Sequence, residues 1–415
     1  MILAIFAITL VAVALTRLPG IRIDRPAAAL AGAIAMVLAG AFTIREAADA
    51  VDWNTIALLL GMMVIIAGVQ QDGAVTHLTD AVFGGARSPV GLLVRVVLLA
   101  AIASAFLVND AVVLVLTPVL IVYCRNRGLN PIPYLIAEAM ASNIGGVATI
   151  TGNPQNALIG LQSGISFGRF FLHLVPIAAV SCVVLLAAIR LRYQKEVSRP
   201  LTTAPVVSGG ADGVMLRPRW LTRSTIVLIG IVIAFAISPY TSVTISEIAL
   251  IGAAVVLLAS GHNPQELFRR VDWTLLLLFV GLFIVIGAAV NDGLFDWARN
   301  DLSLGNNAGS VATLHAASMG VSQIISNVPF TILMLPILQP HNSNLLWLSL
   351  ASGATLAGNL TLIGSIANLI VAEGAGRQNV RLGFGEYLAT GVPVALVTAG
   401  ASILILWLEH ATGWL

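Results

Sequence analysis

The sequence has 415 residues, of which 58% are hydrophobic and only 10% are charged. Soluble domains carry about 25% charged residues, so this chain has too few of them to cover a surface exposed to water. Its formal net charge of +2 gives no reason to expect a nucleic-acid partner. The composition therefore excludes an ordinary soluble domain and predicts a protein of the lipid bilayer.

Apolar runs of membrane-spanning length begin at the N-terminus. The first half predicts spans at 2–18, 27–42 and 55–69, a hairpin at about 90–122, an interrupted helix at about 135–160 and a last span that ends near Ile189. Such runs predict transmembrane helices, because a backbone in lipid must satisfy its own hydrogen bonds. The run at 2–18 lacks a basic segment and a small-residue cleavage site, so we interpret it as a span and not as a signal peptide.

The second half has the same order. It predicts spans at 224–237, 248–258 and 275–290, a hairpin at about 310–338, an interrupted helix at about 345–371 and a last span at 388–408. The segment 191–223 between the halves is polar and basic and is predicted to be a linker. Because the alternation of apolar and polar residues typical of a membrane β-barrel is absent, the predicted fold class is an all-α polytopic membrane protein.

A repeat relates the two halves, 1–190 and 224–415. Val51-Asp52-Trp53 recurs as Val271-Asp272-Trp273. Further aligned pairs are Gly61 with Gly281, Asn109 with Asn327, Pro118 with Pro336, Gly152 with Gly364 and Asn156 with Asn368. Chance alignment of apolar residues is easy, but chance alignment of Trp, Asp, Asn, Pro and Gly in the same order is not. We expect Asp52 and Asp272 to cap the helices that follow them.

The distribution of cations indicates the topology. If the stretches around Asn109 and Asn327 are re-entrant hairpins, nearly all Lys and Arg residues fall on one side, and only Arg45, Arg169 and Arg299 fall on the other. Cations favour the cytoplasmic side of a membrane. Each half then has five crossings and one hairpin, ten crossings and two hairpins in all, so the repeats are inverted. This predicts a bacterial inner-membrane protein with a cytoplasmic linker and both termini in the periplasm.

Polar residues stand at both predicted hairpin tips. Asn109 and Asp110 interrupt the first apolar hairpin, and Ser326 and Asn327 interrupt the second. A turn within the membrane exposes backbone groups, which is tolerated only where protein or a water-filled cavity satisfies them. Inverted repeats with such interruptions are typical of secondary transporters, whose substrate site lies at the repeat interface near the membrane midplane.

Each interrupted helix supplies a second polar cluster. Gly and Pro break the helix, and the half-helix ends then direct partial charges at a ligand. Small polar residues also join membrane helices without binding a substrate, but their presence in both halves favours a site. The candidate substrate-binding residues are Asn143, Gly145, Gly146, Thr149, Thr151, Gly152, Asn153 and Asn156 in the first half and Asn359, Thr361, Gly364, Ser365 and Asn368 in the second, together with Asn109, Ser326 and Asn327 at the tips.

Asp110 is the candidate proton-coupling residue. A carboxylate at the centre of a bilayer costs about 2.5–3.5 kcal/mol on insertion scales, so we expect it to be functional or paired. Desolvation would favour its protonated form, as a proton carrier requires. The alternative is a structural ion pair with Arg95, the nearest cation in sequence. Glu138 is a weaker candidate, since the start of its span also fits a position at the membrane surface.

The tip motifs carry a family resemblance. Ala105-Phe106-Leu107-Val108-Asn109-Asp110-Ala111 with Leu116-Thr117-Pro118 resembles the first hairpin of the bacterial arsenite/antimonite efflux permeases, members of the ion transporter superfamily. Leu362-Ile363-Gly364-Ser365-Ile366-Ala367 is similar to their second interrupted helix. The resemblance implies efflux of arsenite or antimonite, as neutral trihydroxides, in exchange for protons. It also implies a homodimer and leaves room for a soluble ATPase partner.

Two other motifs resemble the sister branch of sodium-coupled divalent-anion symporters. They are Ser326-Asn327-Val328-Pro329 and Gly152-Asn153-Pro154-Gln155-Asn156. The alternative function is therefore sodium-coupled symport of a dicarboxylate or sulfate, although Asp110 would disfavour a dianion. An enzyme is not expected, because no metal cluster or nucleophile–base pair stands out, and neither is a cofactor. Without a nucleotide-binding motif, the expected energy source is an ion gradient.

Overall fold

The computed structural model describes residues 1–14, 24–74, 82–83, 86–197, 222–296 and 304–415. In these residues every regular element is a helix. Seven of the helices are long and apolar enough to cross a membrane, and four shorter apolar helices accompany them. The end of the first predicted span, 15–18, and most of the linker 191–223, at 198–221, lie outside the described residues.

The helices of the first half follow the predicted order. Three apolar helices come first, then two helices joined end to end, then a helix in two pieces, then a long helix. They are α1 (Ile2–Ala14), α2 (Arg25–Leu38), the short α3 (Ile44–Asp49), α4 (Trp53–Gln71), α6 (Pro89–Leu107), α7 (Asn109–Asn126), α8 (Ile132–Val147), α9 (Pro154–Ser163), α10 (Phe167–Arg192) and the short α11 (Gln194–Val197).

The second half repeats this order. Its helices are α12 (Arg223–Ile237), the 3-10 turn η1 (Ser238–Tyr240), α13 (Ile245–Ala259), the short α14 (Pro264–Arg269), α15 (Trp273–Asn291), α17 (Ala308–Ile325), α18 (Asn327–Leu338), η2 (Gln339–His341), α19 (Asn344–Ala357), α20 (Ile366–Arg377) and α21 (Phe384–Ala411). Within the described residues, a helix or a pair of helices therefore covers each apolar run that the sequence predicts.

Two close helix crossings join the halves. A Cβ atom added to Gly61 in α4 would lie 2.6 Å from the backbone carbon of Ala249 in α13. A Cβ atom added to Gly281 in α15 would lie 2.6 Å from the same atom of Ala29 in α2. Glycine is needed at both positions because backbone meets backbone there. The two crossings use the same pair of aligned positions, exchanged between the halves. We call α1–α4 and α12–α15 the scaffold.

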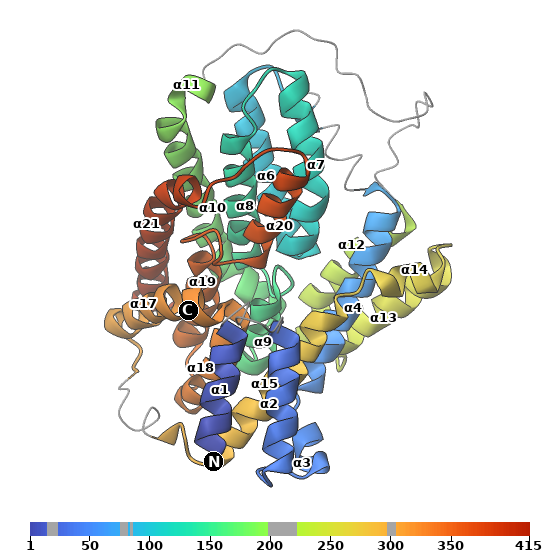
Figure 1. Ribbon diagram of the computed structural model, residues 1–415, viewed down its shortest axis with the longest axis vertical. Helices are drawn as coiled ribbons and strands as arrows, with labels where there is room; N and C mark the ends of the chain where they lie inside the picture. The colour runs from blue at the N-terminus through green and yellow to red at the C-terminus, as the bar shows by residue number, and fades with distance from the viewer. Residues whose placement is uncertain (15–23, 75–81, 84–85, 198–221, 297–303) are drawn as a thin grey trace.

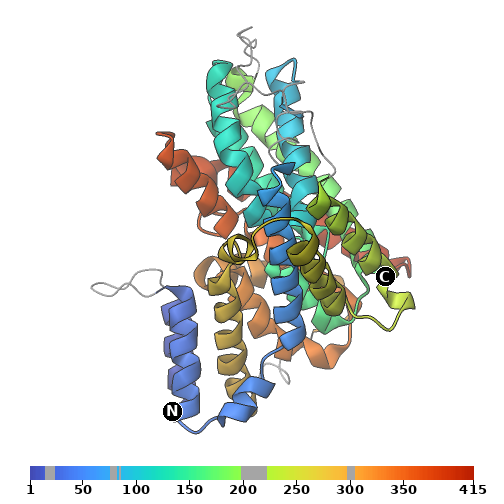
Figure 2. The same ribbon diagram turned by 90° about the vertical axis from the view of Figure 1, so that its right-hand side faces the viewer.

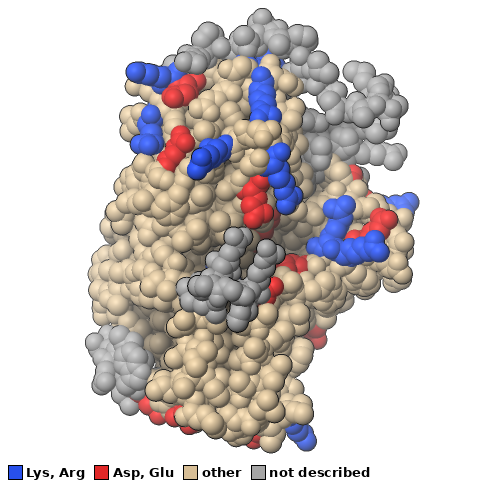
Figure 3. Space-filling model, in the orientation of Figure 1, with Lys and Arg blue, Asp and Glu red and all other residues tan. Residues whose placement is uncertain are grey.

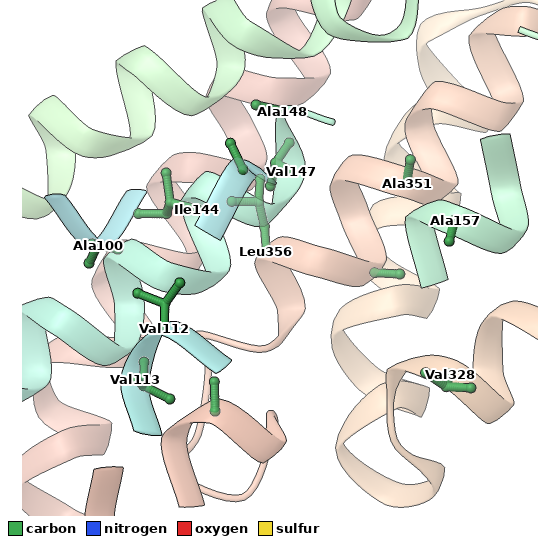
Figure 4. Packing of buried hydrophobic residues seen from close by; sticks show 14 of the residues in the cluster. Ala100, Val112, Val113, Ile144, Val147, Ala148, Ala157, Val328, Ala351 and Leu356 are labelled. Carbon is green, nitrogen blue, oxygen red and sulfur yellow. The ribbon is translucent and has the colours of Figure 1, made fainter. Parts of the chain in front are cut away.

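The remaining helices form a second group, which we call the carrier unit. Within it α6 packs on α8, α17 on α19 and α10 on α21. Figure 1 shows α6, α7 and α10 at one end of the molecule and α1, α2 and α3 at the other. Figure 2 shows the same division from the side. The close view in Figure 4 shows buried aliphatic side chains of α7, α8 and α19 gathered together, with Val328 of α18 farther off, on the side of Ala157 and Ala351.

The repeated Val-Asp-Trp motif has a local structural explanation. Asp52 accepts hydrogen bonds from the backbone of α4, and Asp272 accepts one from the backbone of α15, so both predicted caps are confirmed. Trp53 Nε1 donates to the Ala48 carbonyl at 3.0 Å, and Trp273 Nε1 donates to that of Phe268 at 2.9 Å. Each motif thus fixes a short helix, α3 or α14, at a sharp angle to the long helix that follows. The sequence analysis did not predict these short helices.

Exposed cations gather at one end of the molecule. Figure 3 shows Lys and Arg over the upper end and beside α14, and little positive charge at the lower end near α3. The exposed residues at the upper end include Arg125, Arg190, Arg192 and Lys195 at the ends of α7 and α10 and in α11. Arg45 in α3 is the exposed cation of the lower end named in the sequence analysis. The exposed cations in the described residues are thus unevenly divided between the two ends, as the counting of cations in the sequence led us to expect.

Candidate functional site

Both hairpins turn at a single residue with left-handed backbone geometry. α6 meets α7 at Val108, where φ is 62°, and α17 meets α18 at Ser326, where φ is 74°. Such φ values are uncommon for residues other than glycine and cost on the order of 1–3 kcal/mol. Asn109 and Asn327 follow these joints and are both buried. In each half, therefore, a residue with a strained backbone directly precedes a buried asparagine, and the two pairs align.

Asn156 and Asn368 satisfy the backbone where the helices are interrupted. Asn156 Nδ2 donates to the carbonyl of Gly146 at 2.8 Å, and Asn368 Nδ2 donates to that of Gly358 at 2.8 Å. Longer bonds of the same two amides reach the carbonyls of Thr149 and Thr361, at 3.2 and 3.1 Å. The carbonyls at a helix end lack helical partners, and the side chains of these two asparagines supply the missing hydrogen-bond donors. The backbone carbonyls at each predicted interruption therefore have hydrogen-bond partners within the protein.

The predicted glycines permit close approach inside the interruptions. A Cβ atom on Gly145 would lie 2.0 Å from the Ala101 carbonyl oxygen in α6. One on Gly152 would lie 2.6 Å from the Gly146 carbonyl oxygen, and one on Gly364 would lie 2.7 Å from Gln323 Oε1. Each of these positions would need a backbone or side-chain shift to hold a larger residue. These glycines allow close packing, and because they have no side chain they could offer a ligand only their backbone groups.

Asn143 is the centre of the polar network. Its Oδ1 accepts from Asn109 Nδ2 at 3.0 Å and from Ser365 Oγ at 2.9 Å. Its Nδ2 donates to Asn359 Oδ1 at 2.9 Å and to Asn368 Oδ1 at 3.1 Å. All five residues are buried. One amide thus joins the first hairpin tip and the first interrupted helix to the second interrupted helix.

Thr355 of α19 forms a second link between the halves, from the second half to the interrupted helix of the first. Asn153 Nδ2 donates to Thr355 Oγ1 at 3.1 Å, and Thr355 Oγ1 donates to Asn156 Oδ1 at 3.3 Å. Thr355 occupies the position in α19 that aligns with Asn143 in α8. Sequence reasoning missed this residue, although its alignment with Asn143 was available as a signal.

The predicted threonines of the interruptions hold the hairpins. Thr149 Oγ1 donates to the Ala105 carbonyl near the end of α6, and Thr151 Oγ1 donates to the same oxygen at 3.4 Å. In the second half Thr361 Oγ1 donates to Gln323 Oε1 at 2.7 Å. Gln323 aligns with Ala105, so its side-chain carbonyl replaces a backbone carbonyl. Gln323 was also missed, because a single Gln in an apolar run has no distinctive pattern.

The second hairpin tip contacts a cation of the scaffold. Arg25 Nη1 donates to Ser326 Oγ at 3.2 Å. The sequence analysis counted Arg25 only among the cytoplasmic cations, so this contact was missed. A Cβ atom on Gly358 would lie 3.3 Å from Asn327 Nδ2, which places Asn327 against the second interrupted helix. The Oδ1 atoms of Asn109 and Asn327 are buried and have no hydrogen-bond partner among the residues that the structure describes.

Asp110 lies where the first hairpin meets α20. Its carboxylate accepts a hydrogen bond from the backbone N–H of Ala367, at the start of α20, and lies within electrostatic range of Asp272. Arg95 instead donates to the Val82 carbonyl at 2.6 Å. The alternative of an Asp110–Arg95 ion pair is therefore wrong. A carboxylate at a helix N-terminus occupies the place where such a helix binds anions.

Glu138 is fully buried between α8 and α7. Thr117 Oγ1 donates to Glu138 Oε1 at 2.9 Å, whereas Oε2 has no partner. None of the Glu138 side chain is exposed, so the carboxyl is enclosed by protein. Burial of an unpaired carboxylate is costly. The Glu138 partner Thr117 lies seven residues, about two turns, along α7 from Asp110.

A cavity of about 630 Å³ lies between the scaffold and α18. Phe42, Gly287, Leu335 and Pro336 contribute to its apolar wall, and Asp52 and Gln162 to its polar wall. Gln162 Nε2 donates to Asp52 Oδ2 at 2.7 Å, so the end of α9 contacts the start of α4. The cavity marks a second place where the carrier unit meets the scaffold.

Comparison with known proteins agrees with this architecture. The YdaH transporter of Alcanivorax borkumensis has a similar structure, with a TM-score of 0.63 at 14% sequence identity over 100% of this chain and 97% of that chain. An uncharacterized transporter of Mycobacterium bovis is 32% identical over 428 residues, which cover 98% of this chain and 99% of that protein. The silicon efflux transporter LSI3 of Oryza sativa subsp. japonica is 25% identical over 93% of each chain.

These likenesses and the helix arrangement define the class of the protein, an all-helical multi-pass membrane transporter. The family described as Citrate transporter matches residues 3–352. The chain belongs to this CitMHS citrate transporter family. A particular closeness to the arsenite/antimonite efflux permeases is not among these findings.

Proposed function

We propose that the protein exports arsenite or antimonite, as neutral trihydroxides, in exchange for protons. The observation that carries this proposal is the chemistry of the network around Asn143, which consists of amides, hydroxyls and backbone carbonyls. Such groups match a small solute that both donates and accepts hydrogen bonds and carries no charge. The Asn109 and Asn327 Oδ1 atoms, buried without partners, are ready acceptors for its hydroxyl groups.

Two findings support a neutral substrate. Asp110 already occupies the N-terminus of α20, so the protein's own carboxylate fills the place where an anion would bind. The relative from Oryza sativa is named for silicon efflux. In neutral water dissolved silicon and arsenite are both uncharged hydroxides, so one kind of site would suit either.

For the fold we propose two inverted repeats of five crossings and one re-entrant hairpin each, with repeat boundaries near 190 and 224. The paired crossings of Gly61 with Ala249 and of Gly281 with Ala29 support the inversion. The joints at Val108 and Ser326 support the hairpins, because each turns the chain back within the apolar layer. The gathering of cations at one end supports a cytoplasmic linker and periplasmic termini.

Proton coupling is assigned to Asp110, with Glu138 as a second titratable group. Asp110 stands at the substrate network and is half-exposed, so protons can reach it. Protonation would weaken its hydrogen bond from Ala367 N–H and take up an oxygen that could otherwise accept from a substrate hydroxyl. A proton and the substrate would then compete for one carboxylate, which is what exchange requires.

Transport into everted membrane vesicles tests this proposal. Vesicles that contain the protein should accumulate arsenite when their interior is made acidic, and Asp110→Asn should abolish the accumulation. Asp49→Asn, a change of an exposed carboxylate at the end of α3, is the matched control and should transport normally. Arsenite uptake that ignores the proton gradient, or its persistence in Asp110→Asn, would contradict the assignment.

The second candidate is sodium-coupled transport of an anion such as citrate. The family description favours it, and so does Arg25, whose guanidinium touches the second hairpin tip. Helix N-termini of α7, α9 and α18 also lie at the site, and these attract anions. Uptake of labelled citrate into right-side-out vesicles under a sodium gradient would establish this candidate in place of the first.

A further inference from the structure

Arg25 stands where a cation does not stabilise its own helix. It is the first residue of α2, directly after Asp24, whose carboxylate accepts from Ala27 N–H at 2.9 Å. A cation in the first turn faces the positive end of the helix dipole, so its charge opposes helix formation. The guanidinium is half-buried and donates to Ser326 Oγ. We therefore expect Arg25 to act through a contact outside α2.

The scaffold holds Arg25 in a fixed place. α2 packs on α15 through Gly281 and Ala29, and on α1 through Gly32, where an added Cβ atom would lie 2.2 Å from Thr9 Oγ1. These contacts pack α2 closely against its neighbours. Arg25 thus reaches from a closely packed scaffold helix to a residue of the carrier unit.

Ser326 is suited to receive this contact. It is the joint between α17 and α18, and its side chain does not cap the N-terminus of α18. Its hydroxyl is therefore available to Arg25. The next residue, Asn327, is one of the two tip asparagines with a free Oδ1 atom. Through Ser326, Arg25 fixes the place of a substrate-site amide.

The aligned residues of the other half cannot form this bond. Arg25 aligns with Ile245, the first residue of α13, and Ser326 aligns with Val108 at the first hairpin joint. Both counterparts are apolar. If the two halves exchange conformations during transport, the contact that replaces Arg25–Ser326 in the other state is Val108 against Ile245.

We propose that Arg25 is a positioning residue that holds the second hairpin tip against the scaffold in one of the two states of the transport cycle. No equivalent polar contact holds the first tip in the other state, so the bond biases the protein toward the conformation seen here. The proposal rests on the inverted repeats proposed above and is independent of the substrate. A hydrogen bond to a charged group of this kind shifts such an equilibrium by about tenfold or more.

A cysteine cross-link away from the tips can report the state. Asp52 and Gln162 are in contact across the scaffold and the carrier unit, at 2.7 Å. In full-length protein with Cys124 and Cys182 changed to Ala, Asp52→Cys with Gln162→Cys should be joined by a short bifunctional thiol reagent. The rate of joining measures the population of the present state and requires no substrate.

Arg25→Ala and Ser326→Ala should each slow the joining, by at most about tenfold, and the double variant should match the single variants because one bond is lost. Arg25→Lys should restore part of the rate, and Arg45→Ala, an exposed scaffold cation, should leave it unchanged. Transplanting the pair as Ile245→Arg with Val108→Ser should slow the joining while Arg25 remains. An unchanged rate in Arg25→Ala or in Ser326→Ala, or additive losses in their double variant, would overturn the proposal whatever the outcome of the arsenite assay.

Discussion

Asn143 donates a hydrogen bond to Asn359 at 2.9 Å, and this contact joins interrupted helices that lie more than two hundred residues apart in the chain. Neither residue has a charge, and both are fully or almost fully buried. A buried amide network is stable only when every member has its partners. The site therefore depends on the two halves meeting in one register, and single substitutions within it should affect both.

Asn143→Ala should abolish transport and lower the thermal stability. The change leaves Asn109, Ser365, Asn359 and Asn368 each without one partner, at about 1–3 kcal/mol for a buried unsatisfied group. Ser142→Ala is the matched control, because Ser142 Oγ donates only to the Ala139 carbonyl of its own helix. Melting curves in detergent and vesicle transport measure the two effects. Equal behaviour of the two variants would contradict a central role for Asn143.

Gly61→Ala should destabilise the protein, although alanine is the better helix former. The added methyl group would lie 2.6 Å from the Ala249 backbone and would force α4 and α13 apart. Gly281→Ala should have a similar effect, because it meets Ala29 at the same distance. Overpacking of this kind costs about 1–3 kcal/mol.

Gly230→Ala supplies the control for this pair of variants. No atom lies within 4 Å of a Cβ atom at this helical position in α12. The change should be neutral or stabilise by up to about 1 kcal/mol, the usual difference in helix propensity between Gly and Ala. Thermal melting of the three variants side by side checks the expectation, which fails if Gly61→Ala melts as high as Gly230→Ala.

Polar contacts of Asp72 at the end of α4 should stabilise the fold by an amount that depends on pH. His262 Nε2 lies 2.6 Å from Asp72 Oδ1, and Ser224 N–H donates to Asp72 Oδ2 at 3.2 Å. Burial raises the pKa of Asp72, but hydrogen bonds from Thr222, His262 and Ser224 together bring it below its ordinary value. A carboxyl whose folded pKa is lowered stabilises the protein above its unfolded value of about 3.9, and this contribution is lost as the pH falls through the folded pKa.

Asp72→Asn should therefore lower the melting temperature at pH 7 and have a smaller effect at pH 4 and below. The measurement is the difference in apparent melting temperature between the variant and the native protein across this range. Asp49→Asn, at an exposed position in α3, should show no such difference. A deficit of Asp72→Asn that stays constant down to pH 3 would mean that the charge of Asp72 does not matter.

Much of the fold could be predicted, because apolar runs and glycine or proline breaks are local signals. The runs at 55–69 and 275–290 lie within α4 and α15, and the breaks fall where α8 gives way to α9 and α19 to α20. The short helices α3 and α14 could not be predicted from apolar content, because polar side-chain contacts, such as the hydrogen bonds from Trp53 and Trp273 to backbone carbonyls, fix them.

The site was predictable only where the two halves share a residue type. Asn156 and Asn368 share one, and the structure gives them the same partners. Arg25 aligns with the apolar Ile245, so alignment of the halves does not single it out, whereas Thr355 was missed although it aligns with Asn143. The burial of Glu138 was also missed, since α7 covers it and packing between distant segments leaves no local pattern.

Glu138→Gln tests whether this buried carboxyl carries protons or only fills space. The glutamine keeps an oxygen that can accept from Thr117 Oγ1 and has nearly the same volume, so the fold should persist. If Glu138 takes part in coupling, arsenite transport by the variant should no longer respond to the proton gradient, while gradient-independent arsenite exchange continues. Thr117→Val is the structural control, since it removes the hydrogen bond but leaves the titratable group. A variant Glu138→Gln that still transports in proportion to the gradient would leave Asp110 as the sole coupling residue of the proposal.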